Sequence, residues 1–331
     1  MNLKIKQLGH SLLVLLFAVL LIGLAIRYRE NRDLPEEPVT DTPVIVEEDT
    51  TSDDFTELTY SNGSATLSFS QNEDGTWLWN DGPNFPLNDS TVLAIVEQLE
   101  TWSPRETITD AATLETCGFN KPSASLTAST PQRSLTLIFG KAVADGSGYY
   151  VRLNEDTTTA YVMDKTLYQL LSTPIYDMYE LPTFPQLTES NIRSIVIRGY
   201  QSGEVLAITT LSAQSTDGDI PTLRSSGANV SDDPRVRGLL ADLQALALGK
   251  CVSYRPSDKA VSVCGLEQPA ATLTVDFTNA EGLGQILTMS IGNRLDDRSG
   301  RYVRIDEDST IYMMPTELLD PLMNISVKGL E

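Results

Sequence analysis

The sequence is poor in histidine and cysteine, the side chains that most often carry nucleophilic chemistry or bind transition metals. Its one histidine, His10, lies in an apolar N-terminal stretch. The rest of the chain therefore lacks a Ser-His or Cys-His pair and any histidine metal cluster. Three cysteines do not make a disulfide framework, and a catalytic thiol without a histidine partner is unfavourable. We expect no catalytic residues, no metal site and no cofactor.

Positive charge is scarce as well. The chain has 24 lysines and arginines against 45 aspartates and glutamates, which gives a net charge of −21. A surface with this field repels phosphate backbones, so nucleic-acid binding is not expected. A phosphate loop is missing too, because Gly282-Leu283-Gly284 lacks the required lysine and the third glycine. The length of 331 residues allows about two domains, each with its own core.

One long apolar run stands at the N-terminus. Residues 8–26 are interrupted only by two glycines, His10 and Ser11. At about 1.5 Å per residue, a helix of this length spans roughly the hydrocarbon thickness of a bilayer. No cleavage site of the A-x-A kind precedes Arg27, and no cysteine follows the run. We therefore predict an uncleaved membrane anchor at residues 1–32.

The segment after the anchor is acidic. Residues 33–54 contain nine acidic side chains, no basic ones and three prolines, so we predict an extended tether. Positive charges on the two sides of the apolar run nearly balance. The acidic segment favours a single-pass protein with a cytoplasmic N-terminus and an extracytoplasmic C-terminal part.

An internal repeat occupies the rest of the chain. Cys-Gly-Phe-Asn-Lys-Pro at residues 117–122 recurs as Cys-Gly-Leu-Glu-Gln-Pro at 264–269, and further matches follow in the same order. This indicates duplication. We predict repeat units at 55–171 and 192–331, joined by a connection at 172–191. The residues that define the repeat are Trp77, Cys117, Gly118, Pro122, Gly140 and Tyr150, and in the second unit Cys264, Gly265, Pro269, Gly292 and Tyr302.

Local patterns predict the same elements in both units. Asn62-Gly63 between two alternating runs suits a type I′ hairpin. Apolar residues at helical spacing follow Asp89 or Ser90, and again Asp232 or Asp233. Paired strands, a last hairpin and a short helix (165–171 or 317–323) complete each unit. The fold class is therefore α+β: two tandem copies of a β-hairpin, helix, antiparallel β-meander and short helix, after one N-terminal transmembrane helix.

Between the units, prolines alternate with Tyr176, Tyr179 and Phe184. Because these aromatic side chains are too many to leave in water, we predict a packed connection. Cys251 and Cys264 are close enough in sequence to form a disulfide if their segments meet, but small buried thiols are the default. The acidic turns 154–156 and 306–308 lack the spacing of a calcium loop, and we interpret them as solvated.

Arg152 and Arg304 are the charged residues of most interest, because each ends the same strand motif in its unit. One interpretation is that each covers the sheet or pairs with a neighbouring acid. The other is a repeated clamp for an anion or a carboxylate, in contact with a partner or ligand.

The pattern of Trp77, Cys117-Gly118-Phe119-x-x-Pro122, Phe139-Gly140 and the strand 149–152, with the matches in the second half, spans about residues 55–325. It resembles a bacterial domain-of-unknown-function family of membrane-anchored, extracytoplasmic tandem-repeat proteins. Members of that family often accompany ABC-transporter subunits of the gliding-motility type. The resemblance implies an accessory role at the cell envelope and supplies no catalytic residues.

Three hypotheses follow. The first is a non-catalytic accessory or scaffold protein that binds a protein partner, for which the resemblance implies ABC-transporter subunits. The second is an extracellular module for a glycan or a small ligand. The third is a carboxylate-based hydrolase, for which acidic residues alone give no spacing evidence.

Overall fold

The computed structural model describes residues 55–214, 222–305 and 308–329. The predicted membrane anchor and acidic tether lie outside these ranges, as do Asp306 and Glu307 of the second acidic turn. Within the described ranges, no helix has the length and apolar character needed to cross a membrane. The described chain is mostly β, with two antiparallel sheets and several helices.

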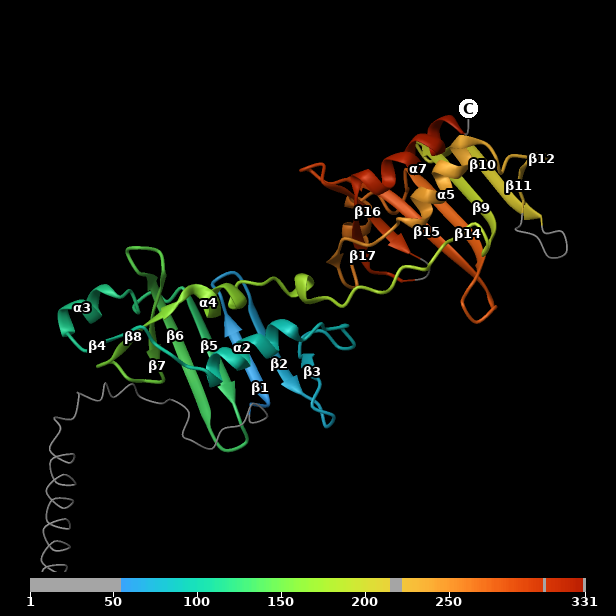
Figure 1. Cartoon of the computed structure of the whole chain (residues 1–331). Coiled ribbons are helices and arrows are strands. Elements are labelled where there is room, and N and C mark those ends of the chain that lie inside the picture. Colours follow the sequence, from blue (N-terminus) through green and yellow to red (C-terminus); the bar gives the residue numbers. More distant parts are fainter. Residues whose placement is uncertain (1–54, 215–221, 306–307, 330–331) are drawn as a thin grey trace, which may run out of the picture. The chain divides into compact units, whose positions relative to one another are not determined.

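The first unit, from β1 to α4, is built around an eight-stranded sheet (Figure 1). The strand order is β3-β2-β1-β5-β6-β7-β8-β4, and each neighbouring pair is antiparallel. Its strands are β1 (Glu57–Ser61), β2 (Thr66–Gln71), β3 (Trp77–Trp79), β4 (Glu106–Ile108), β5 (Ala124–Ser129), β6 (Ser134–Ala142), β7 (Gly148–Leu153) and β8 (Ala160–Asp164). Its helices are α2 (Ser90–Glu100), α3 (Ala111–Thr116) and α4 (Lys165–Leu171).

The second unit, from β9 to α7, has a nine-stranded sheet in the order β12-β11-β10-β9-β14-β15-β16-β17-β13. The equivalent strands of the two units therefore occupy equivalent places. The strands are β9 (Ile192–Gln201), β10 (Glu204–Gln214), β11 (Thr222–Ser225), β12 (Ala228–Asn229), β13 (Lys250–Ser253), β14 (Ala271–Thr278), β15 (Gly284–Arg294), β16 (Gly300–Ile305) and β17 (Ile311–Pro315). The helices are α5 (Pro234–Gln244), α6 (Asp258–Val263) and α7 (Thr316–Lys328).

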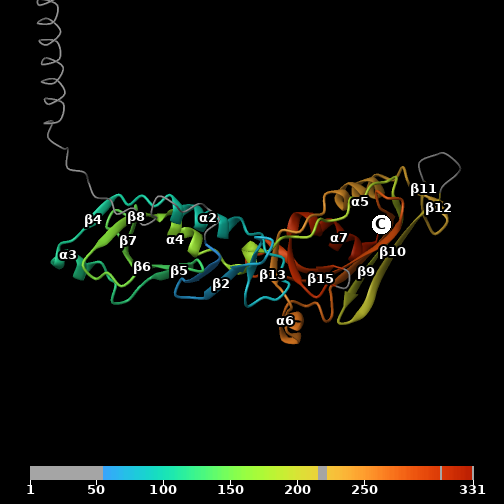
Figure 2. The same ribbon diagram turned by 90° about the horizontal axis from the view of Figure 1, so that it is seen from below.

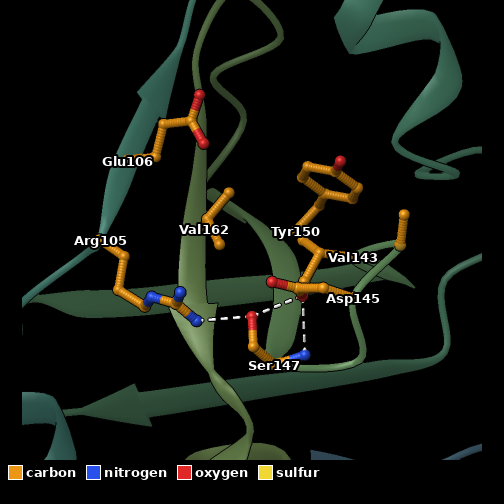
Figure 3. A pocket seen from close by; sticks show the side chains of 8 residues that line it. Arg105, Glu106, Val143, Asp145, Ser147, Tyr150 and Val162 are labelled. Atoms are coloured by element: carbon orange, nitrogen blue, oxygen red, sulfur yellow. Dashed lines mark hydrogen bonds between the residues drawn. The ribbon is translucent and has the colours of Figure 1, made fainter.

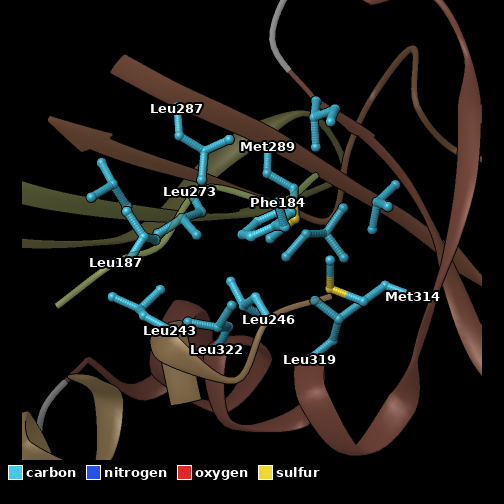
Figure 4. Packing of buried hydrophobic residues seen from close by; sticks show 14 of the residues in the cluster. Phe184, Leu187, Leu243, Leu246, Leu273, Leu287, Met289, Met314, Leu319 and Leu322 are labelled. Carbon is cyan, nitrogen blue, oxygen red and sulfur yellow. The ribbon is translucent and has the colours of Figure 1, made fainter. Parts of the chain in front are cut away.

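Apolar periodicity explains which face of each sheet is covered. In α2, the buried residues Val92, Ile95, Val96 and Leu99 form one stripe, and this helix packs against α4. In the second unit, Leu243 of α5 and Leu319 and Leu322 of α7 face the buried side chains of β14 and β15 (Figure 4). Asp233 caps α5 as predicted, and its carboxylate accepts from the backbone N–H of Arg235.

The short helices α3 and α6 lie on the other face of each sheet, as Figure 2 shows for α6. Neighbouring strand residues demonstrate this, because Val303 of β16 belongs to the large core, while Tyr302 packs with Cys264 and Leu266 beneath α6. In the first unit, Cys117 packs with Val162 and Tyr150 in the same way. Each unit therefore has a large core on one face and a small one at one end of the other face.

The repeated Cys-Gly and Phe/Ile-Gly steps hold this small core together. The backbone N–H of Lys141 donates to the carbonyl of Cys117 at 2.8 Å, and that of Asn293 donates to Cys264 at 2.8 Å. A Cβ on Gly140 or Gly292 would lie 2.2 Å from the same carbonyl oxygen. Glycine is therefore required wherever the helix end approaches the strand this closely.

The connection is packed, as predicted. It contains the 3₁₀ helix η1 (Ile175–Met178), and Tyr179 and Phe184 are buried. The hydroxyls of Tyr179 and Tyr312 lie 3.1 Å apart. The Tyr179 ring also stands edge-on to Phe85, with ring centroids 5.2 Å apart.

Two local expectations need correction. The Asn62 turn is not type I′, because only Gly63 has a positive φ; the Asn62 side chain instead accepts from the backbone N–H groups of Ser64 and Ala65. Helix α7 extends beyond the predicted 317–323, since its additional turns pack on β9 and β10. The three cysteines are free and buried, so the Cys251–Cys264 pair is not formed and the default expectation is confirmed.

Candidate functional site

The two predicted arginines occupy the same register position in the two sheets. Arg152 of β7 lies opposite Ile138 of β6, and Arg304 of β16 lies opposite Ser290 of β15. Their neighbours Val151 and Val303 are fully buried under the helices. Because strand side chains alternate, both arginines project from the other face. Neither forms an ion pair within the described part of the chain.

Hydroxyl groups cover much of the open face of the first sheet, which is the face opposite helices α2 and α4. On β1, β2, β5 and β6, nearly every residue that points away from the helices is serine or threonine. These residues are Thr59, Ser61, Thr66, Ser68, Ser70, Ser125, Thr127, Ser129, Ser134 and Thr136. Several pair across strands: the hydroxyl oxygens of Thr59 and Ser68 are 2.9 Å apart, and those of Thr127 and Thr136 are 3.2 Å apart. We call this surface the hydroxyl face.

Arg152 lies at the border between the hydroxyl face and helix α3. Its Cζ lies 4.8 Å from the centroid of the Phe119 ring, and its Nε is buried without a hydrogen-bond partner. Beside it is a cavity of about 480 Å³, which we call the Arg152 recess. The recess is lined by Ala111, Leu114, Glu115, Phe119, Asn120, Arg152 and Thr157.

A second cavity, of about 400 Å³, lies on the same side of the sheet beside Tyr150 (Figure 3). The Arg105 guanidinium donates to the Ser147 hydroxyl at 2.6 Å, and this hydroxyl donates to the Asp145 carboxylate at 2.6 Å. The hydrogen bonds from Ser147, with the nearby charge of Arg105, lower the pKa of Asp145. The Arg105 guanidinium is therefore already engaged by the Ser147 hydroxyl, which the Asp145 carboxylate holds in turn.

The three thiols are poorly suited to nucleophilic chemistry. Burial raises the pKa of all three cysteines, and that of Cys251 reaches about 12. At neutral pH they are therefore almost entirely protonated. The described residues contain no histidine and no group of three or more His, Cys, Asp or Glu side chains placed to hold a metal ion.

The sequence identified Arg152 but not its surroundings. Phe119 belongs to the repeated Cys-Gly-Phe motif, yet nothing local indicates that its ring stacks on an arginine more than thirty residues away. Helix α3 has six residues, none of them buried, so it shows no apolar stripe. Its one local signal is Asp110, whose carboxylate accepts from the backbone N–H of Thr113.

A family model described as Domain of unknown function (DUF4340) matches residues 77–229 and 222–326. The first matched range runs from β3 to β12 and the second from β11 into α7, so two tandem matches together cover most of the chain. Neither a curated protein nor a solved structure matches the sequence.

Proposed function

This chain belongs to the family described as Domain of unknown function (DUF4340), and we propose that it is a non-catalytic binding protein of the cell envelope. Residues 8–26 anchor it in the membrane as a single-pass protein with a cytoplasmic N-terminus. The two units lie outside the cytoplasm and bind a protein partner. The partner we propose is an ABC-transporter subunit, which the family resemblance implies, so the protein is an accessory or scaffold subunit.

The observation that carries the proposal is the hydroxyl face. In a chain with 21% charged residues, the outward positions of β1, β2, β5 and β6 include only two charged residues, Glu57 at one end of β1 and Lys141 near the end of β6. Charged groups cost the most free energy when a partner removes them from water. Several of the hydroxyls already pair with one another, so covering them leaves fewer polar groups unsatisfied. This face is therefore the large surface of the first unit that a partner covers at the lowest cost.

The proposal assigns no reaction to the protein. The buried, protonated thiols and the lack of histidine in the described residues support a binding function over a catalytic one. A carboxylate-based hydrolase is the least supported of the alternatives, because the many acidic residues by themselves do not define a catalytic pair. Binding of a small ligand or glycan is the second candidate, and the Arg152 recess is the observation that favours it.

Site-specific photo-cross-linking in native membranes tests the proposal. A photoreactive amino acid is placed at Thr59 on the hydroxyl face, or at Glu97 on α2 as the matched control. Both positions are exposed, and they lie on opposite sides of the unit. We expect Thr59, but not Glu97, to cross-link to a transporter subunit identified by mass spectrometry. Equal labelling from both positions, or no cross-link from Thr59, contradicts the proposal.

Protease treatment of intact cells tests the placement separately. We expect residues after the tether to be digested from outside. Protection in intact cells, followed by digestion after lysis, contradicts the extracytoplasmic location.

A further inference from the structure

The guanidinium of Arg152 lies over an aromatic ring, and no residue in the described part of the chain accepts a hydrogen bond from it. It stacks on Phe119, and its Nε is covered. Among the described residues, no oxygen accepts a hydrogen bond from Arg152, and no carboxylate lies within ion-pair distance of it. The two terminal nitrogens, Nη1 and Nη2, are therefore the donors left for a ligand. An arginine whose geometry is already ordered loses less entropy when it binds.

Two lysines lie beside the turn that supplies Phe119 and Asn120 to the recess, while Glu115 lines it and Asp110 and Asp156 directly precede two other lining residues. Lys121 belongs to the same turn as Phe119 and Asn120, and its backbone N–H donates to Gly118. The stem of Lys141 lies against Gly118, so that a Cβ there would be 2.5 Å from its Cγ. Two lysines thus flank the turn that supplies part of the recess, and they favour a negatively charged ligand.

The second unit lacks these features at the equivalent positions. Leu266 stands where the first unit has Phe119, and Gln268 and Asn293 replace the two lysines. Glu267 adds a negative charge in place of Asn120. Arg304 therefore lacks the equivalent of Phe119 and of the two lysines that lie near Arg152. The second unit has the same backbone structure with different side chains at these positions. Phe119, Lys121 and Lys141 are therefore not needed for the fold.

The lining of the recess selects the kind of anion. A planar fork of two N–H donors matches a carboxylate. Glu115 lines the same recess, and its charge opposes a dianion such as phosphate more than a carboxylate. Ala111 and Leu114 supply apolar surface beside the charged group. The volume of about 480 Å³ suits one small group and falls within the usual range of ligand pockets.

From these observations we infer that the Arg152 recess binds a carboxylate carried next to a small apolar group, as at the C-terminal end of a peptide chain. The inference rests on the proposed binding function, because the partner supplies this carboxylate. It assigns the site to the first unit only, with Arg152 as the binding residue and Phe119 as the residue that positions it.

Binding of a defined probe to the purified full-length protein tests the inference. The probe is N-acetyl-Gly-Ala with a free carboxylate, and binding is measured by saturation-transfer NMR titration. We expect the amidated peptide to bind at least tenfold more weakly. Free acetate competes less well than the peptide, because it lacks the apolar side chain. Inorganic phosphate that competes as well as the peptide contradicts the carboxylate assignment.

Variants locate the site. Arg152→Gln weakens binding at least tenfold, and Arg152→Lys restores only part of it, because a lysine does not form a planar fork. Arg304→Gln is the matched control, and it leaves binding unchanged. Phe119→Leu copies the second unit and weakens binding about threefold, which keeps the test valid if Arg152→Gln does not fold. Unchanged binding in both Arg152→Gln and Phe119→Leu overturns the inference, as does an equal loss in Arg304→Gln.

The two proposals fail separately. If the peptide does not bind but Thr59 still cross-links to its partner, the assignment of the recess is wrong and the proposed function stands. If the peptide binds and no partner is cross-linked, the recess is a site for a free carboxylate ligand and the proposed function is wrong.

Discussion

Gly140 and Gly292 occupy equivalent positions in the two units. Each lies against the carbonyl oxygen of a cysteine at the end of a short helix. Phe119 and Leu266 occupy equivalent places in the adjoining turns, yet one supports an arginine and the other packs into a small core. Glycine repeats at positions 140 and 292 because each meets a backbone carbonyl. Phe119 and Leu266 are not held by such a contact, and their difference indicates which unit carries the recess.

The open sheet faces differ in the same manner. The first presents paired hydroxyls. The corresponding face of the second sheet also has serines and threonines, but it adds Arg198, Tyr200 and Asp276, and Ile208 and Ile286, which are 58% and 64% exposed. Two surfaces this different fit different partners. Tandem copies of one frame thus give the protein two unlike surfaces.

The largest expected effect comes from the cores. Trp77 and Leu223 occupy equivalent strands, and both are 1% exposed. Trp77→Ala should lower the free energy of unfolding of the first unit by about 3–5 kcal/mol, and Leu223→Ala that of the second by about 2–5 kcal/mol. All three tryptophans (Trp77, Trp79 and Trp102) lie in the first unit, so tryptophan fluorescence in a denaturant titration follows that unit.

Far-UV circular dichroism in the same titration reports the backbone of both units, so the part of its transition that tryptophan fluorescence does not share follows the second unit. We expect Leu223→Ala to leave the fluorescence transition unchanged. If Leu223→Ala shifts the fluorescence transition as well, the two units unfold together and cannot be compared as separate domains.

The next largest effect is expected at the glycine that both units have beside their small core. Gly140→Ala and Gly292→Ala each force a methyl group against a carbonyl oxygen that lies 2.2 Å from the new Cβ. We expect each to destabilise its own unit by about 1–3 kcal/mol, as overpacked sites do. Denaturant titrations of the two variants should give similar losses. A loss in one unit only would show that the two small cores are not equivalent.

A smaller effect, a gain of peptide binding, is expected when the features of the Arg152 recess are copied into the second unit. Replacing Leu266, Gln268 and Asn293 by Phe, Lys and Lys copies the first unit into the second. In a chain that also carries Arg152→Gln, we expect the triple variant to bind N-acetyl-Gly-Ala several-fold more tightly than Arg152→Gln alone. NMR titration measures the gain, and amidated peptide is the control. No gain would show that residues beyond the turn determine the site.

Acid sensitivity of the short helices gives the smallest effect. Hydrogen bonds from the Thr113 hydroxyl and backbone N–H lower the pKa of Asp110, the cap of α3, whereas α6 is capped by Ser257, which does not titrate. A lowered folded-state pKa stabilises the fold above the unfolded value of about 4 and ceases to do so as the pH falls through the folded value. Asp110→Ser should therefore reduce the loss of stability between pH 7 and pH 3.

Fluorescence-monitored denaturation at the two pH values measures this difference. Ser257→Ala in α6 is the control, since it removes a cap without removing a titrating group. An unchanged pH dependence in Asp110→Ser would show that the cap contributes nothing to acid stability.

The sequence alone determined the features that depend on residues near one another in the chain. Alternation of apolar residues placed strands, helical spacing placed α2 and α5, and Asp233-Pro234 marked the start of α5. The duplication was visible because the same backbone approaches require glycine twice. Burial of the free thiols followed from their small, apolar character.

Only the tertiary structure decided what depends on distant residues. It placed α3 and α6 on the face opposite the larger helices, because their few residues are held by contacts with the sheet and not by an apolar stripe. It also separated Arg152 from Arg304: their local sequences are alike, and the difference lies in a turn contributed from elsewhere in the chain. A binding residue is defined by the partners that surround it, and in a sheet those partners come from strands that only folding brings together.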